Sequence, residues 1–221
     1  MKLKLFPLIM IGLLLGSVVA QEEAITPGME KDDSKDLKPG DIAPSWALMF
    51  APGKFEFLRT WAEEEDKKLR LIVSQPDRHA VLMSFFATWC KPCMKELPLL
   101  EEVYQKYKDE RVKFFLVDIT EATRTNPGEV YGVAYKDVPV AGPFLRGKGV
   151  TMQILFDTRG VVMKNYNAQT LPRLFLMDGN RKITLTRRGF HDGEEEKFKK
   201  DLSVEIERLL AELPPAKNKT K

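Results

Sequence analysis

The chain is poor in the residues that hold metals and build disulfide frameworks, with two cysteines and two histidines among its 221 residues. Structural zinc takes four ligands, and His79 and His191 lack the paired spacing of such ligands. Half a zinc site at the cysteines stays as the weaker interpretation, and we assign no metal ligand. Two thiols are also too few for the dense disulfide framework of a small secreted scaffold.

An excess of charge of one sign is also missing. The chain has 35 lysines and arginines against 32 aspartates and glutamates, and the two signs alternate along the sequence. This pattern excludes the basic surface of a nucleic-acid-binding protein and a polybasic membrane patch. We therefore expect no nucleic-acid partner.

Long hydrophobic runs are absent as well. The apolar stretch 5–15 is short for a membrane span, which needs about 20 residues. Two lysines precede it and the small residues 17–20 follow, which predicts a cleavable secretory signal peptide at 1–20 and a periplasmic or otherwise exported protein. An uncleaved membrane anchor is the alternative. No cysteine follows the stretch, so lipid attachment is excluded, and cleavage would bring the net charge from +3 to +1.

The composition of the remaining chain predicts one domain between two loose segments. Residues 21–40 are polar and rich in charge, proline and glycine, which predicts a flexible leader. Residues 41–213 contain enough leucine, valine, phenylalanine and isoleucine for a core of single-domain size. The tail, 214–221, is expected to be disordered.

Within the domain, short apolar runs alternate with helical patterns, which favours an α/β sheet with helices on both faces. Strands are expected at 80–87, 112–117, 152–156, 173–177 and 183–186. The turn sequence Asp178-Gly179-Asn180 predicts an antiparallel hairpin of the last two. One helix is expected from the cysteines onward, another around Phe198 to Leu209, and a third at 61–65.

The two cysteines lie together in the sequence Trp89-Cys90-Lys91-Pro92-Cys93, between an expected strand and an expected helix. The first turn of a helix stabilises a thiolate through its dipole and its unpaired N–H groups. Cys90 is therefore expected to be the reactive thiol, with Cys93 one turn deeper. A purely structural disulfide is the weaker alternative, because so short a loop removes little chain entropy.

The strand, the motif and a proline five residues after Cys93 resemble the thioredoxin superfamily. Within it, the chain is most similar to the exported TlpA/ResA-like thiol-disulfide oxidoreductases. Further matching segments are Lys38 to Pro44, Met152 to Asp157 and Thr170-Leu171-Pro172. The resemblance implies a thioredoxin-like fold, with a central mixed β-sheet flanked by helices on both faces.

The resemblance also implies a function. The residues leave the direction of electron flow open, and the resemblance favours a reductase. In that direction Cys90, expected to lie nearer solvent, would attack a client disulfide, and Cys93 would resolve the mixed disulfide. The expected partners are oxidised client proteins, apocytochrome c among them, and a membrane thiol-reductant conduit. No cofactor and no permanent membrane anchor are expected.

Several neighbours of the cysteines receive supporting roles. Trp89 is expected to pack over the thiols. The charge of Lys91 favours a thiolate, and Pro92 restricts the loop.

A second group of expected site residues lies further along the chain. Pro172, if cis, would let the backbone of Leu171 pair with an extended client segment. Ser84 occupies the position, six residues before Cys90, where many thioredoxins carry a buried aspartate. Glu96 matches a glutamate that some TlpA/ResA-like proteins place near the cysteines, where it could relay protons. A solvated carboxylate on the first helical turn is the equal alternative.

Other functions stay open from sequence alone. A non-catalytic interaction domain could use the same fold without disulfide turnover. A peroxiredoxin-like peroxidase would need a Pro-x-x-x-Thr-x-x-Cys arrangement, which Thr88 and Cys90 do not match. Copper delivery would require three residues between the cysteines and a distal histidine. The segment 55–77 departs from the resemblance, because it is longer and more charged than the family's usual hairpin.

Overall fold

The computed structural model describes residues 24–25, 36–69, 77–126, 128–130 and 132–214. The predicted signal peptide and nearly all of the predicted tail lie outside these residues. In the described part of the chain, no helix is both long and apolar enough to cross a membrane.

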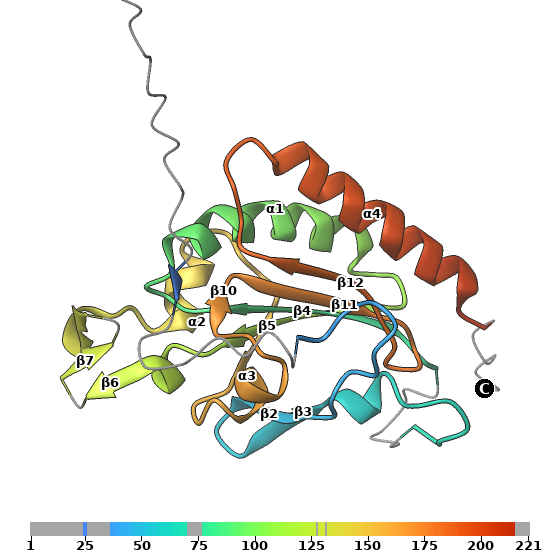
Figure 1. The fold of residues 1–221 in the computed structure, drawn as a ribbon, viewed down its shortest axis with the longest axis horizontal. Helices are drawn as coiled ribbons and strands as arrows, with labels where there is room; N and C mark the ends of the chain where they lie inside the picture. Colours follow the sequence, from blue (N-terminus) through green and yellow to red (C-terminus); the bar gives the residue numbers. More distant parts are fainter. Residues whose placement is uncertain (1–23, 26–35, 70–76, 127, 131, 215–221) are drawn as a thin grey trace, which may run out of the picture.

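A seven-stranded mixed sheet forms the centre of the molecule, in the order β12-β11-β4-β5-β9-β2-β3 (Figure 1). The strands are β2 (Ala47–Ala51), β3 (Lys54–Phe57), β4 (Ala80–Phe86), β5 (Val112–Asp118), β9 (Gln153–Phe156), β11 (Arg173–Met177) and β12 (Ile183–Arg188). Strand β4 runs parallel to β5 and antiparallel to β11. All seven residues of β4 are buried, as expected of a strand that is covered on both faces.

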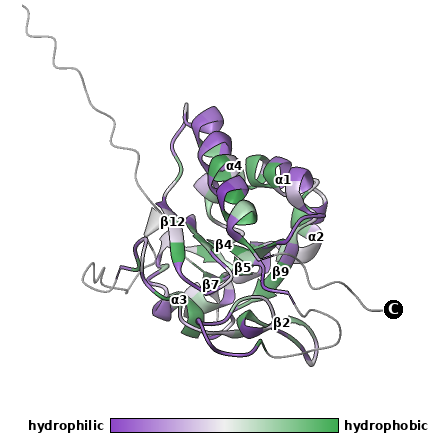
Figure 2. Cartoon of the chain, turned by 90° about the vertical axis from the view of Figure 1, so that its right-hand side faces the viewer, coloured by the Kyte–Doolittle hydropathy of each residue, from purple (hydrophilic) through white to green (hydrophobic). Residues whose placement is uncertain are grey.

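Helices cover both faces of this sheet. Helix α1 (Lys91–Tyr107) and helix α4 (Glu195–Glu212) lie side by side on one face, and the short helix α3 (Val161–Asn165) lies on the other (Figure 1). Figure 2 shows hydrophilic and hydrophobic residues together along α4, as expected of a helix that buries one side. The predicted α/β architecture and the antiparallel β11–β12 hairpin are confirmed.

The chain between β5 and β9 carries additional elements. The 3-10 turn η3 (Glu121–Thr123) leads into a small sheet of β6 (Arg124–Asn126), β7 (Glu129–Val130) and β8 (Val133–Ala134). The 3-10 turn η4 (Tyr135–Asp137) and helix α2 (Ala141–Arg146) follow. The small sheet projects beyond the edge of the main sheet (Figure 1).

The predicted helix at 61–65 is wrong. Only the 3-10 turn η2 (Leu58–Thr60) forms there, and the following residues are held by distant partners instead. The backbone N–H of Glu63 donates to the carbonyl of Gly179 at 3.1 Å. The buried carboxylate of Glu63 pairs with Arg181 at 2.9 Å. These tertiary bonds outweigh the local helical preference of the sequence.

Two described parts of the predicted leader make defined contacts. Strand β1 (Ala24–Ile25) pairs antiparallel with β10 (Thr170–Leu171). Further on, Asp36 forms ion pairs with Arg173 and Arg188. The contacts of the domain therefore begin before residue 41, whereas the flexibility of the leader stays a prediction.

Candidate redox site

The redox motif begins where the central strand β4 ends. Cys90 is the N-cap of α1, and its sulfur accepts a hydrogen bond from the backbone N–H of Cys93 at 3.2 Å. Pro92 fits the first turn of the helix because backbone N–H groups there have no partner within the helix. The predicted placement of Cys90 at the helix N-terminus is confirmed.

Cys90 and Cys93 form a disulfide with an S–S distance of 2.08 Å. The structure therefore holds the oxidised form of the motif. Both cysteines have no exposed surface, so the prediction that Cys90 lies nearer solvent is wrong for this form. A client sulfur can reach Cys90 only after neighbouring groups have moved.

Two threonines after β5 hold the chain just before the cysteines. The side-chain oxygen of Thr120 accepts a hydrogen bond from the backbone N–H of Thr88 at 3.0 Å. The side-chain oxygen of Thr123 accepts one from the indole N–H of Trp89 at 2.9 Å. Thr120 is itself held by Asp118, whose pKa is raised by burial.

Sequence reasoning missed these two threonines. Their position follows from the parallel pairing that sets Phe86, the last residue of β4, opposite Asp118, the last residue of β5. Chain segments that leave parallel strands at the same edge are neighbours, so the residues after Asp118 reach the cysteine motif. The sequence signal that could have revealed them was that the two predicted parallel strands end at the same edge of the sheet.

The three predicted supporting residues differ in exposure. Trp89 is half-buried and packs against the core, Lys91 is exposed, and Pro92 is half-buried. The hydrogen bond to Thr123 fixes the orientation of the Trp89 ring. The roles predicted for these residues toward the thiols stay predictions.

Glu96 is buried on α1, with only 1% of its surface exposed. The hydroxyl of Ser84 donates a 2.8 Å hydrogen bond to its carboxylate. Burial raises the pKa of Glu96 to about 7, although the Ser84 hydrogen bond and the charge of Arg187 lower it. The alternative of a solvated carboxylate is wrong. The proton relay predicted for Glu96 stays a prediction.

The predicted cis peptide bond is present between Leu171 and Pro172. Strand β11 begins at the next residue, Arg173, which lies opposite Phe85 near the end of β4. The sheet thus brings the cis-proline to the same edge as the cysteine motif. Leu171 is fully buried, and its strand β10 carries the pairing with β1.

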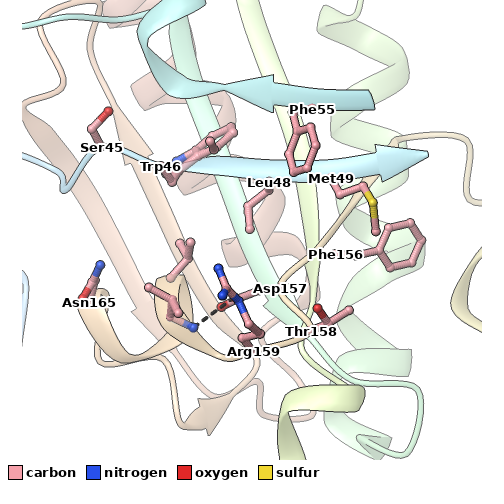
Figure 3. Close-up of a pocket in the computed structure, with 13 residues that line it drawn as sticks. Ser45, Trp46, Leu48, Met49, Phe55, Phe156, Asp157, Thr158, Arg159 and Asn165 are labelled. Carbon is pink, nitrogen blue, oxygen red and sulfur yellow. Dashed lines mark hydrogen bonds between the residues drawn. The ribbon is translucent and has the colours of Figure 1, made fainter. Parts of the chain in front are cut away.

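A separate cavity of about 380 Å³ lies among β2, β3, the end of β9 and α3 (Figure 3). Trp46, Phe55 and Phe156 line it together with Arg159. Asp157, also in the lining, accepts a 3.0 Å hydrogen bond from the N–H of Val161 at the start of α3. Neither cysteine belongs to its lining. Among the described residues, no group of three or more histidine, cysteine, aspartate or glutamate side chains is placed to hold a metal.

A disulfide at the start of a helix, beside a cis-proline on a mixed sheet, defines a thioredoxin-like fold. Solved structures share it: a Chlorobium tepidum protein described as thiol:disulfide interchange protein DsbE aligns with a TM-score of 0.55 and 22% identity. That alignment covers 77% of this chain and 99% of the other.

Residues 56–202 match the model of the Redoxin family, and the chain belongs to this family. The chain is similar to thiol-disulfide oxidoreductase ResA of Bacillus thuringiensis, with 31% identity over 103 residues, or 47% of this chain and 51% of the relative. It is 27% identical to ResA of Oceanobacillus iheyensis over 171 residues, or 77% of this chain and 75% of that relative. It thus spans about half the length of the Bacillus relative. The predicted resemblance to ResA-like proteins is confirmed.

Proposed function

We propose that this chain is an exported thiol-disulfide oxidoreductase that reduces disulfides of client proteins through Cys90 and Cys93. The observation that carries the proposal is the Cys90–Cys93 disulfide at the N-terminus of α1, at the sheet edge that also holds the cis-proline. The ResA relatives are named thiol-disulfide oxidoreductases, which supports the same chemistry.

The reaction starts from the reduced pair. The N-terminus of α1 stabilises the thiolate of Cys90, which attacks one sulfur of the client disulfide. A bond forms between Cys90 and that sulfur, the client disulfide breaks, and the other client sulfur leaves as a thiolate.

Cys93 completes the transfer. Its thiolate attacks the Cys90 sulfur, the mixed disulfide breaks, and the second client sulfur leaves as a thiolate. Two electrons have then passed to the client, and the protein is left in the oxidised form that the structure holds. A thiol reductant must supply two electrons before the next cycle.

Glu96 is the proton acceptor that we assign to Cys93. The two residues are three positions apart on α1, so their side chains lie on the same face of the helix, one turn apart. With a pKa of about 7, Glu96 is partly ionised at neutral pH and can take the Cys93 proton as the resolving thiolate forms.

The client would lie along β10. Leu171 precedes the cis-proline, and its backbone would pair with an extended client segment next to Cys90. In the cell we infer an exported location, clients such as apocytochrome c, and regeneration by a membrane thiol-reductant conduit.

Insulin reduction in the presence of dithiothreitol tests the proposal. The chain without residues 1–20 is expected to accelerate precipitation of the insulin B chain, whereas Cys90→Ser is expected to be inactive. Absence of acceleration by the unmodified protein would favour a non-catalytic interaction domain. Equal rates for both proteins would show that Cys90 is not the nucleophile.

A further inference from the structure

The backbone edge of β10 is already occupied in this structure. Ala24 lies opposite Leu171, and Ile25 lies opposite Thr170, in an antiparallel pair. An extended client segment on β10 would need the same backbone groups, because a strand edge offers one row of donors and acceptors. The leader strand and a client strand therefore exclude each other at Leu171.

A second contact, at Asp36, holds the leader close to the cis-proline. Asp36 accepts a hydrogen bond from the Asn167 amide at 3.1 Å and pairs with Arg173 at 3.5 Å. It also forms an ion pair with Arg188. Arg173 directly follows Pro172, so this contact adjoins the loop that would receive the client.

The burial of Arg173 makes the Asp36 contact specific. Only 3% of the Arg173 side chain is exposed, and burial lowers its pKa to about 10, while the charge of Asp36 raises it. A buried guanidinium needs a negative partner, since an unpaired buried charge is costly. Asp36 supplies that charge from the leader side.

We propose that strand β1 is a built-in competitor for the client site: β1 occupies β10, and Asp36 fastens the chain beside the cis-proline. The inference rests on the proposed function, because it assigns the same edge to clients. A client strand binds only when β1 has left β10. Because β1 and Asp36 belong to the same chain, the contact at Asp36 keeps β1 near β10 and favours its rebinding.

Full burial at this edge is consistent with the proposal. Leu171 has zero exposed surface in the form in which β1 is paired. A site in this state needs a rearrangement before a protein disulfide can enter. Release of β1 frees the backbone edge that would bind the client.

Proline substitutions test the pairing, because proline lacks the N–H that a strand ladder uses. The variant is Ala24→Pro with Ile25→Pro, made in the chain without residues 1–20. The control is Ala24→Val with Ile25→Val, which changes the same side chains and keeps both N–H groups. Two substrates are compared: a linear peptide with an internal disulfide, and hydroxyethyl disulfide, which has no peptide backbone.

The proline variant is expected to raise kcat/KM for the peptide by about 2- to 10-fold, because a larger fraction of the protein has β10 free to bind the peptide. Reduction of hydroxyethyl disulfide should be unchanged, and the valine control should resemble the unmodified protein on both substrates. An unchanged rate on the peptide, or an equal gain on both substrates, would overturn the proposal.

The Asp36 contact is tested by Asp36→Asn against Asp41→Asn. Asp41 is a matched carboxylate, whose oxygen accepts from the nearby N–H of Lys38 at 2.9 Å. We expect Asp36→Asn to increase the rate on the peptide disulfide, whereas Asp41→Asn should not. Equal effects of the two substitutions would contradict a fastening role for Asp36.

Amide hydrogen exchange at Thr170 and Leu171 tests the pairing of β1 without relying on disulfide reduction. In the oxidised protein, at least one of these amides should exchange faster in the proline variant and at the normal rate in the valine control. Equal exchange in all three proteins would rule out the β1 pairing. If exchange responds but none of the proteins reduces a disulfide, the leader pairs as proposed and the oxidoreductase function fails.

Discussion

The hydroxyl of Ser84, in the middle of β4, donates a 2.8 Å hydrogen bond to the carboxylate of Glu96 on α1. This bond joins the central strand to the redox helix through a carboxyl that has almost no contact with solvent. The acid that many thioredoxins carry at the position of Ser84 is thus replaced by a hydroxyl that binds an acid from the helix.

Replacement of Glu96 by Gln should change how stability depends on pH. The pKa of Glu96 in the folded protein, about 7, lies above its ordinary value of 4.5. The folded state therefore binds more protons than the unfolded state in this window, and its stability falls as pH rises from about 4.5 to about 7. Glu96→Gln should remove this loss, a relative gain of up to about 3 kcal/mol above pH 7.

Urea unfolding of the oxidised protein at pH 4.5 and pH 8 measures this effect. Ser84→Ala is the companion variant, because it removes the hydrogen bond that lowers the Glu96 pKa and leaves the carboxyl in place. The Glu96 pKa should then rise further, so the pH range over which stability falls should move to higher pH. A constant difference between Glu96→Gln and the unmodified protein at both pH values would contradict the raised pKa.

The two cysteines should differ in trapping experiments. Cys93→Ser is expected to accumulate mixed disulfides with exported proteins, because the thiol that resolves them is missing. Cys90→Ser should not accumulate them. Non-reducing electrophoresis of tagged variants, followed by identification of the trapped proteins, makes the comparison, and similar client profiles from both variants would reverse or void the assigned roles.

Thr123→Val should slow disulfide reduction, although it should lower stability only slightly. The substitution removes the oxygen that accepts the Trp89 indole N–H and should cost about 1 kcal/mol of unfolding free energy. Insulin reduction should also slow, because the chain before Cys90 loses one of its two threonine contacts. Thr184→Val is the control, since Thr184 bonds the carbonyl of Leu176 at 3.3 Å on the β11–β12 hairpin. Equal activity of the two variants would contradict a positioning role for Thr123.

Arg181→Met should destabilise the fold without altering the chemistry. Arg181 and Glu63 are 7% and 3% exposed, and removal of one partner from a buried ion pair costs about 3–5 kcal/mol. Arg59 also contacts Glu63 at 2.9 Å, so we expect the lower end of that range. Thermal unfolding measures the loss.

Arg208→Met is the matched control for this prediction. Arg208 is more exposed and pairs with Glu205 and Glu212 on the surface of α4, so its loss should cost about 1 kcal/mol or less. Similar losses from the two variants would mean that the Glu63–Arg181 pair is not needed to stabilise the segment after η2.

The sequence predicted the parts of the fold that depend on local pattern. The apolar run before Trp89 and the helical spacing after Cys93 identified β4 and α1. The expected helix at 61–65 failed, because Glu63 also pairs with Arg181, more than a hundred positions away. No periodicity in the local sequence could reveal that pair.

The site was predictable to a similar extent. Cys90, Cys93 and the cis-proline follow from a specific motif and its resemblance. Burial of Glu96 depends on how α1 packs over Ser84, and spacing alone left the buried and solvated states equally possible. The pairing of Ala24 with Leu171 joins two segments with no shared pattern, so only the three-dimensional structure could show it.

Thr120 and Thr123 precede the small sheet β6–β8 in the chain, and this order has a consequence for engineering. The bonds that position the redox motif are complete before the chain enters that sheet. Loops that connect its strands should therefore accept insertions or grafted recognition sequences without displacing Cys90. The same scaffold could thus be given new client preferences through a segment that takes no part in the electron transfer.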